Sequence, residues 1–128
     1  MTLRGKHTWD RRSARAPSSG SLARAHLDTI RAALGSDRRI AGVLGVSPSQ
    51  VTRWRRGQLP DHENADRLGG LALVVEMLLR WLDAEVVSDW LEGANAHLAN
   101  RAPAHLLRQG RVADVIGAIE AEKTGVHA

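Results

Sequence analysis

The stretch from Leu68 to Leu82 is the most apolar part of the sequence, and only Glu76 and Arg80 introduce charge into it. A membrane span needs roughly 18 uninterrupted apolar residues, so this stretch is too short to form one. Its leucines and valines recur every three to four residues, which predicts one long buried helix over residues 62–83. A helix this apolar has to be covered on most sides, either by its own domain or by a second copy of the chain.

Shorter segments with helical spacing occupy the rest of the chain, and none alternates apolar and polar residues as a strand does. The 128 residues include four tryptophans and no Phe or Tyr, so Leu, Val, Ile and Ala must form the core, a composition that favours helices. We therefore expect an all-α fold, with an N-terminal helix-turn-helix bundle over residues 21–83 and a small helical domain over residues 84–128. Helix boundaries are expected at Ser21, Gly35, Ser36, Gly45, Ser47, Pro48, Gly57, Gly93, Pro103, Gly110 and Gly125, with a loop over residues 95–102.

The charged residues are divided unevenly between the two halves of the chain. Residues 1–60 contain 12 Lys and Arg against three Asp, a net charge of +9, whereas residues 61–128 contain six basic and 11 acidic residues, a net charge of −5. A basic half suits a polyanion such as DNA, although an ordinary solvated surface would have the same composition. Residues 1–20 are basic and lack hydrophobic periodicity, so we expect a disordered arm, either lying along DNA or forming an untethered terminus.

The segment over residues 39–57 has the spacing of a DNA-binding helix-turn-helix. Ala41 is small where the two helices would cross, Gly45 permits the tight turn, and Val51 and Trp54 would bury the inner face of the second helix. The opposite face would read base edges, with Arg55 and Arg56 beside the phosphates at its end. If the helix pair were only a packing scaffold, these residues would be solvated. The candidate DNA-binding residues are Arg38, Arg39, Ser47, Ser49, Gln50, Thr52, Arg53 and Arg56.

This segment resembles the Xre family of phage-repressor-like regulators, whose sequences contain Leu-Gly-Val-Ser, then Arg-Trp and a terminal Gly. Residues 44–47, Arg53, Trp54 and Gly57 match that pattern. Members of the family often carry a Gln that touches phosphate near the start of the first helix, where this chain has Arg38 and Arg39. The resemblance implies binding to double-stranded operator DNA.

A second pattern covers residues 84–128 and resembles the toxin-binding domain of Xre/MbcA/ParS-type antitoxins. It consists of Trp90, Leu91, Asn95, Leu98, Arg101, Pro103, Leu106, Leu107, Gly110, Val115, Ile119 and Gly125. Its apolar members also fit simple core packing. Asn100 occupies a position where the family often has Gly, and Asn tolerates a left-handed backbone better than most residues.

The resemblance implies a partner, namely a RES-domain toxin that degrades NAD and is inhibited when the antitoxin covers its pocket. In that family the end of the antitoxin chain approaches the active site of the toxin. The candidate toxin-binding residues are Asn95, Asn100, Arg101, Lys123, Thr124, Gly125, Val126, His127 and Ala128.

Motifs of catalysis are missing from the sequence. It contains no cysteine, no phosphate-binding glycine loop, no GxSxG or HExxH motif and no pair of carboxylates in a catalytic arrangement. We therefore expect a protein that is not an enzyme and that has no cofactor and no metal site. No N-terminal segment combines an apolar core with a cleavage site, so a cytoplasmic location is expected.

Two functions fit these patterns. The first is an antitoxin that inhibits a toxin through its acidic half and represses its own operon through its basic half. The alternative is a stand-alone transcriptional regulator whose second half only dimerises. In both cases we expect a homodimer, within a larger hetero-oligomer for the antitoxin, because helix-turn-helix proteins of this type usually need two copies to span successive major grooves.

Overall fold

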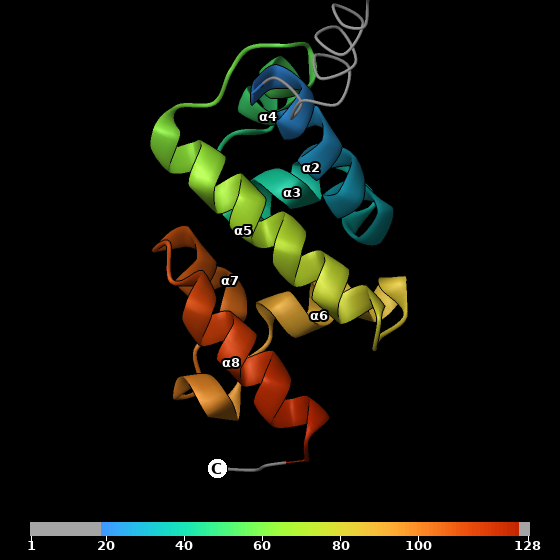
Figure 1. The fold of residues 1–128 in the computed structure, drawn as a ribbon, viewed down its shortest axis with the longest axis vertical. Helices are drawn as coiled ribbons and strands as arrows, with labels where there is room; N and C mark the ends of the chain where they lie inside the picture. The colour runs from blue at the N-terminus through green and yellow to red at the C-terminus, as the bar shows by residue number, and fades with distance from the viewer. Residues whose placement is uncertain (1–18, 126–128) are drawn as a thin grey trace, which may run out of the picture.

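The computed structural model describes residues 19–125, which form α-helices and one short 3-10 helix, with no β-strand in that range (Figure 1). The expectation of an all-α fold is therefore confirmed. The elements are α2 (Ser19–Leu34), α3 (Asp37–Leu44), α4 (Pro48–Arg55), α5 (His62–Leu79), α6 (Ala84–Glu92), η1 (Ala96–Leu98), α7 (Pro103–Arg108) and α8 (Val112–Lys123).

Helix α5 runs diagonally through the middle of the molecule and contacts elements on both sides of it (Figure 1). Helices α2, α3 and α4 lie toward one end, and α6, α7 and α8 lie toward the other. One hydrophobic core extends from α2 through α5 to α8. The two groups of helices share this core. The predicted division of the chain into two domains between residues 83 and 84 stays a prediction. Core residues include Leu27, Ile30, Ile40, Trp54, Leu68, Leu71, Val75, Leu78, Val87, Leu91, Leu106, Val115 and Ile119.

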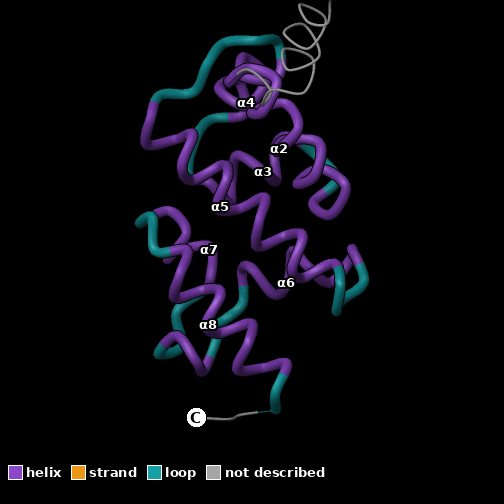
Figure 2. The backbone as a smooth tube through the Cα atoms, in the orientation of Figure 1, coloured by secondary structure: helices purple, strands orange, loops and turns teal. Residues whose placement is uncertain are grey.

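Local capping explains why several helices begin and end where they do. The Ser36 hydroxyl accepts a hydrogen bond from the backbone N of Arg39 at the start of α3, and Ser47 does the same for Gln50 at the start of α4. Gly45 ends α3 with a φ of 75°, in the left-handed region that favours glycine. These boundaries agree with the sequence. The segment between α4 and α5 passes over one end of the molecule (Figure 2).

Two predicted boundaries are wrong, and one predicted loop contains more structure than expected. Helix α2 begins at Ser19, so Ser21 lies inside it and residues 19 and 20 belong to a helix instead of an arm, whose remaining residues 1–18 lie outside the described range. Helix α5 ends at Leu79, and the chain turns after it. Leu82 follows the turn and is partly buried against the core. Its apolar side chain therefore extends the helical pattern of the sequence beyond the end of the helix. The expected loop over residues 95–102 contains η1 and a bridge between Asn95 and Arg101.

No helix between residues 19 and 125 is both long enough and apolar enough to cross a membrane.

Candidate functional site

Helices α3 and α4 pack against each other and are joined by a turn at residues 45–47. On the inner face, Ile40 and Ala41 of α3 and Val51 and Trp54 of α4 are buried. The small Ala41 and the glycine at the turn bring the two helices close together, as the spacing in the sequence predicts. On the opposite face of α4, Ser49 and Arg53 are exposed.

The residues predicted to contact DNA lie on α3 and α4 and at the ends of α4, and most of their side chains are exposed. Arg38, Arg39 and Arg56 are exposed and pair with no acidic side chain among residues 19–125. Arg53 is exposed as well, and its Nη2 donates to Oε1 of half-buried Gln50 at 2.6 Å. This hydrogen bond holds the Arg53 guanidinium over the first turns of α4.

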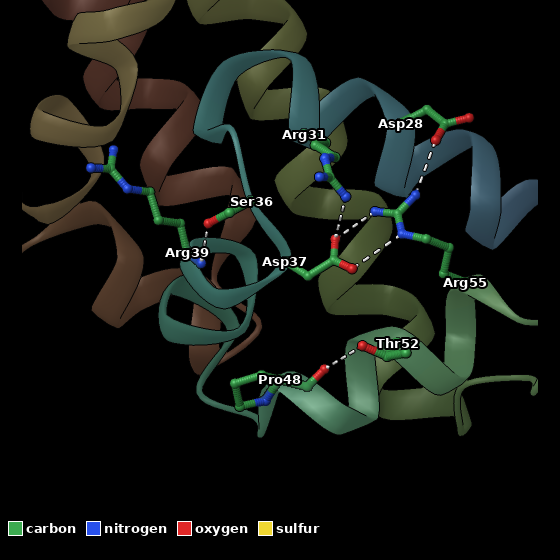
Figure 3. Close-up of polar contacts among 8 residues, drawn as sticks. All are labelled: Asp28, Arg31, Ser36, Asp37, Arg39, Pro48, Thr52 and Arg55. Carbon is green, nitrogen blue, oxygen red and sulfur yellow. Dashed lines mark hydrogen bonds and ion pairs between the residues drawn. The ribbon is translucent and has the colours of Figure 1, made fainter.

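The three hydroxyl groups on this surface are partly used by the backbone and by one another. Ser47 caps α4, and its Oγ lies 3.2 Å from Oγ of Ser49. Thr52 Oγ1 donates to the carbonyl oxygen of Pro48 at 3.2 Å (Figure 3). Because these bonds satisfy only part of each hydroxyl's capacity, all three retain the ability to contact a ligand.

Arg55 does not join the exposed arginines. Its guanidinium donates to Asp37 of α3, from Nη2 at 2.7 Å and from Nε at 3.2 Å, and to Asp28 of α2 at 3.2 Å (Figure 3). Arg31 adds a further ion pair to Asp37 at 3.4 Å. The sequence predicts that Arg55 lies beside the phosphates. This prediction is wrong, because the Arg55 side chain binds α4 to α2 and α3.

The pairing of Arg55 with Asp37 shifts the pKa of both residues. Hydrogen bonds from Arg55, together with its positive charge, hold the pKa of Asp37 below its ordinary value of 3.8. The same hydrogen bonds raise the pKa of Arg55. Asp37 is 18 residues away from Arg55 in the sequence, so no local pattern could reveal the pair.

At the other end of the molecule, the segment between α6 and α7 forms a closed loop over residues 95–101. The backbone N of Asn95 donates to the carbonyl of Arg101 at 3.2 Å, and the backbone N of Asn100 donates to the carbonyl of Asn95 at 2.8 Å. Asn100 has a φ of 63°, so its expected left-handed backbone is confirmed, and Ala99 shares this conformation with a φ of 56°. Arg101 is exposed, and its Nε donates to the carbonyl of Leu98 at 3.0 Å.

Asn95 is the one buried polar residue among residues 19–125, with 6% of its surface exposed. Its Oδ1 accepts from the backbone N of His97 at 2.9 Å, and its Nδ2 donates to Oε1 of Glu122 at 3.0 Å. Both ends of the amide are therefore engaged inside the chain. Among the predicted toxin-binding residues that the structure describes, Asn95 is thus the one that is buried.

Glu122, near the end of α8, was not singled out from the sequence. Besides Asn95, its carboxylate accepts from Nε1 of half-buried Trp90, at 3.2 Å to each oxygen. A cavity of about 320 Å³ lies beside these side chains, lined by Asp89, Trp90, Gly93, Ala94, Asn95, Ala96, His97 and Glu122. The partners of Glu122 are 27 and 32 residues away, so the sequence carries no sign of the cluster.

The predicted tail begins directly after this cluster. Lys123 lies 4.0 Å from the Glu120 carboxylate, and Thr124 Oγ1 donates to the carbonyl of Ala121 at 3.0 Å. Gly125 has a φ of 76°, in agreement with its predicted role as a helix breaker. Val126, His127 and Ala128, the last three predicted toxin-binding residues, lie outside the described residues.

Arg108 of α7 is a second residue that the sequence did not reveal. Its Nε donates to the carbonyl of Val43 at 2.9 Å, and its Nη2 donates to the carbonyl of Gly42 at 2.7 Å. A Cβ atom on Gly45 would lie 3.1 Å from Cδ of Arg108, so glycine is favoured there both by space and by φ. These contacts join α7 to the end of α3.

No group of three or more His, Cys, Asp or Glu residues in the described part of the chain is arranged to hold a metal ion.

Comparison with known proteins identifies relatives of the chain. No family model matches it. The chain is 34% identical over 88 residues to the mycobacterial cidal antitoxin MbcA of Mycobacterium bovis and to that of Mycobacterium tuberculosis, a match that covers 68% of this chain and 78% of the relative. Its fold is similar to a chain in the crystal structure of the M. tuberculosis MbcT–MbcA toxin–antitoxin complex, with a TM-score of 0.69 and 29% sequence identity over 82% of this chain and 96% of that chain. The chain therefore belongs to the family of the MbcA antitoxins.

Proposed function

We propose that this antitoxin binds and inhibits a toxin similar to MbcT. The observation that supports this most strongly is the likeness to MbcA, which extends over most of the length of that antitoxin, together with a solved relative that is a toxin–antitoxin complex. The chain acts by binding and has no catalytic step of its own in this proposal. The toxin contacts residues 84–128, where the second sequence pattern lies.

Within this half, the exposed loop residues Asn100 and Arg101 touch the toxin directly, and Asn95 acts from below by holding the loop. The toxin is a RES-domain enzyme that degrades NAD, as the resemblance implies. Lys123 to Ala128 enter its active site and exclude the substrate. Most of the binding energy comes from the larger surface over residues 90–122, since a few tail residues lose much of their gain to ordering entropy.

The other end of the molecule binds the operator of its own operon. Four exposed arginines on α3 and α4 support this, because Arg38, Arg39 and Arg56 are free for phosphates and Arg53 is held over the start of α4, where a guanidinium can reach guanine. Ser47, Ser49, Gln50 and Thr52 assist. Two copies of the chain contact successive major grooves.

The dimer forms through exposed apolar side chains around the end of α5. Leu79 at the end of α5, Trp81 in the turn after it and Val86 of α6 are all at least one-third exposed. Leaving these side chains in water is unfavourable, and a second copy would cover them.

Co-expression tests the antitoxin proposal. The gene beside this one is expressed alone and together with this chain, and growth, cellular NAD and co-purification are measured. The expected result is that the neighbour alone lowers NAD and stops growth, and that this chain restores both and co-purifies with it. A neighbour that is toxic in the presence of equal amounts of this chain would contradict the proposal.

A further inference from the structure

We infer that Glu122 is a positioning residue of the proposed toxin-binding surface. Its carboxylate holds the 95–101 loop and helix α6 against the last turn of α8, from which the tail continues. The effect on toxin binding rests on the proposed function, in which this surface contacts the toxin. The positions of the loop and of α6 depend only on hydrogen bonds within the chain.

The carboxylate of Glu122 joins three elements. It lies on α8 and accepts from Nε1 of Trp90 on α6 and from Nδ2 of Asn95 at the start of the loop. Both donors are neutral, and no cation within residues 19–125 pairs with this carboxylate. These bonds are charge-assisted and partly shielded from water, which makes them stronger than bonds between neutral groups.

The loop needs such an external restraint. Ala99 and Asn100 are consecutive residues with left-handed backbones; Asn tolerates this conformation, but Ala adopts it only where the surroundings impose it. Asn95 imposes it locally, because its backbone carbonyl accepts from the backbone N of Asn100 and its Oδ1 accepts from His97. The amide of Asn95 is in turn fixed by Glu122, which therefore controls the shape of the whole loop.

The same residue fixes the point at which the tail leaves the helix. Glu122 precedes Lys123, the last residue of α8, and its bonds to α6 and the loop hold the final turn of the helix against both. A surface that is ordered before binding loses less conformational entropy when the partner arrives. The contribution of Glu122 to toxin binding is therefore pre-organisation, and the residue need not touch the toxin.

The experiment compares Glu122→Ala and Glu122→Gln with the matched control Glu120→Ala, which removes an exposed glutamate from the same helix. In the free protein, we measure amide hydrogen exchange of residues 96–101 and the indole N–H resonance of Trp90. With the toxin, we measure the dissociation constant and the dissociation rate. The wild-type chain is measured beside each variant.

We expect Glu122→Ala to shift the Trp90 indole resonance, to speed exchange throughout the loop and to weaken toxin binding by about tenfold or more. Glu122→Gln keeps an acceptor oxygen, so it should restore part of the loop protection and part of the affinity. Glu120→Ala should match the wild type in loop exchange and in the Trp90 resonance, the two measurements made on the free protein. If Glu122→Ala does not fold, Glu122→Gln and Trp90→Phe, which removes only the indole donor, supply the same comparison.

Unchanged loop exchange in the Glu122 variants would overturn the inference. So would weaker toxin binding with an undisturbed loop, because that result would make Glu122 a direct contact. If the wild-type chain does not bind the toxin, the proposed function fails, whereas loop exchange in the free protein still decides whether Glu122 positions the loop.

Discussion

The Arg108 guanidinium donates from Nε to the carbonyl oxygen of Val43 at 2.9 Å, across 65 residues of sequence. Val43 lies in the last turn of α3, where backbone carbonyls have no partner inside the helix. A positive side chain there satisfies the carbonyls and interacts favourably with the negative end of the helix dipole. Arg108 thereby fixes the end of α3 against α7, which belongs to the other half of the chain.

Replacing this arginine should therefore destabilise the protein. We expect Arg108→Ala to lower the free energy of unfolding by about 1–3 kcal/mol, because it leaves the carbonyls of Gly42 and Val43 without their charged donor. Urea denaturation measures the change. The control is Arg80→Ala, since exposed Arg80 forms no ion pair within residues 19–125. Equal stability of the two variants would show that Arg108 contributes nothing beyond an ordinary surface arginine.

The exposed arginines of α4 should differ in their effect on DNA binding. Arg53→Ala should weaken binding to the operator by about 1–3 kcal/mol and have less effect on scrambled DNA, because Arg53 is expected to read a base. Arg56→Ala should weaken binding to both DNAs alike, since a phosphate contact is the same in every sequence. Fluorescence anisotropy at fixed salt, on an operator located by footprinting, compares the variants. An equal loss on both DNAs for Arg53→Ala would contradict base reading.

Asp37 should make the stability of the protein depend on pH. Because its pKa is lowered from 3.8 on folding, its ionised form contributes stability that is fully present above 3.8 and is lost as the pH falls through the lower pKa of the folded state. The difference in unfolding free energy between wild type and Asp37→Asn should therefore be constant near neutral pH and shrink in acid. Urea denaturation from pH 7 to pH 2.5 measures it, with Asp89→Asn as the control. A difference that persists unchanged at the acid end would exclude the Arg55–Asp37 pair as its source.

The apolar surface at the end of α5 should support self-association. Trp81 is 37% exposed there, and Trp81→Glu should convert a dimer into a monomer because it places a charge in the interface. Leu22→Glu is the matched control, since Leu22 on α2 is 44% exposed outside this surface. Light scattering at micromolar concentration measures the mass. A monomeric wild-type chain would rule the dimer out.

Removal of the tail should separate binding from inhibition. Deleting residues 124–128 should leave the complex with the toxin assembled and restore much of its NAD consumption, because the larger surface over residues 90–122 supplies most of the affinity. An NAD-depletion assay on the purified truncated complex tests this. A tail of the same length made of glycine and serine shows whether inhibition needs the residues of the natural tail or only the volume that a tail occupies. Undiminished inhibition by the truncated chain would move the block to the 95–101 loop.

Much of the architecture follows from interactions between residues close together in the sequence. Ser36 and Ser47 cap helices because a hydroxyl reaches a backbone N three residues later, and Gly45 ends a helix because its φ is positive. The inward face of Val51 and Trp54 follows from the helical period. These features are set by backbone geometry over one or two turns, so a single sequence suffices to locate them.

The partners of the charged side chains depend on which helices the fold brings together. Arg55 and Arg56 are adjacent and chemically alike, yet one is bound to Asp37 and the other is exposed, because only Arg55 faces α2 and α3. The hydrogen-bond partners of Glu122 and Arg108 named above lie 27 to 66 residues away. Neighbouring positions on a helix differ in direction by about 100°, so the packing of the helices selects which of them becomes buried or bound, and no local pattern carries that information.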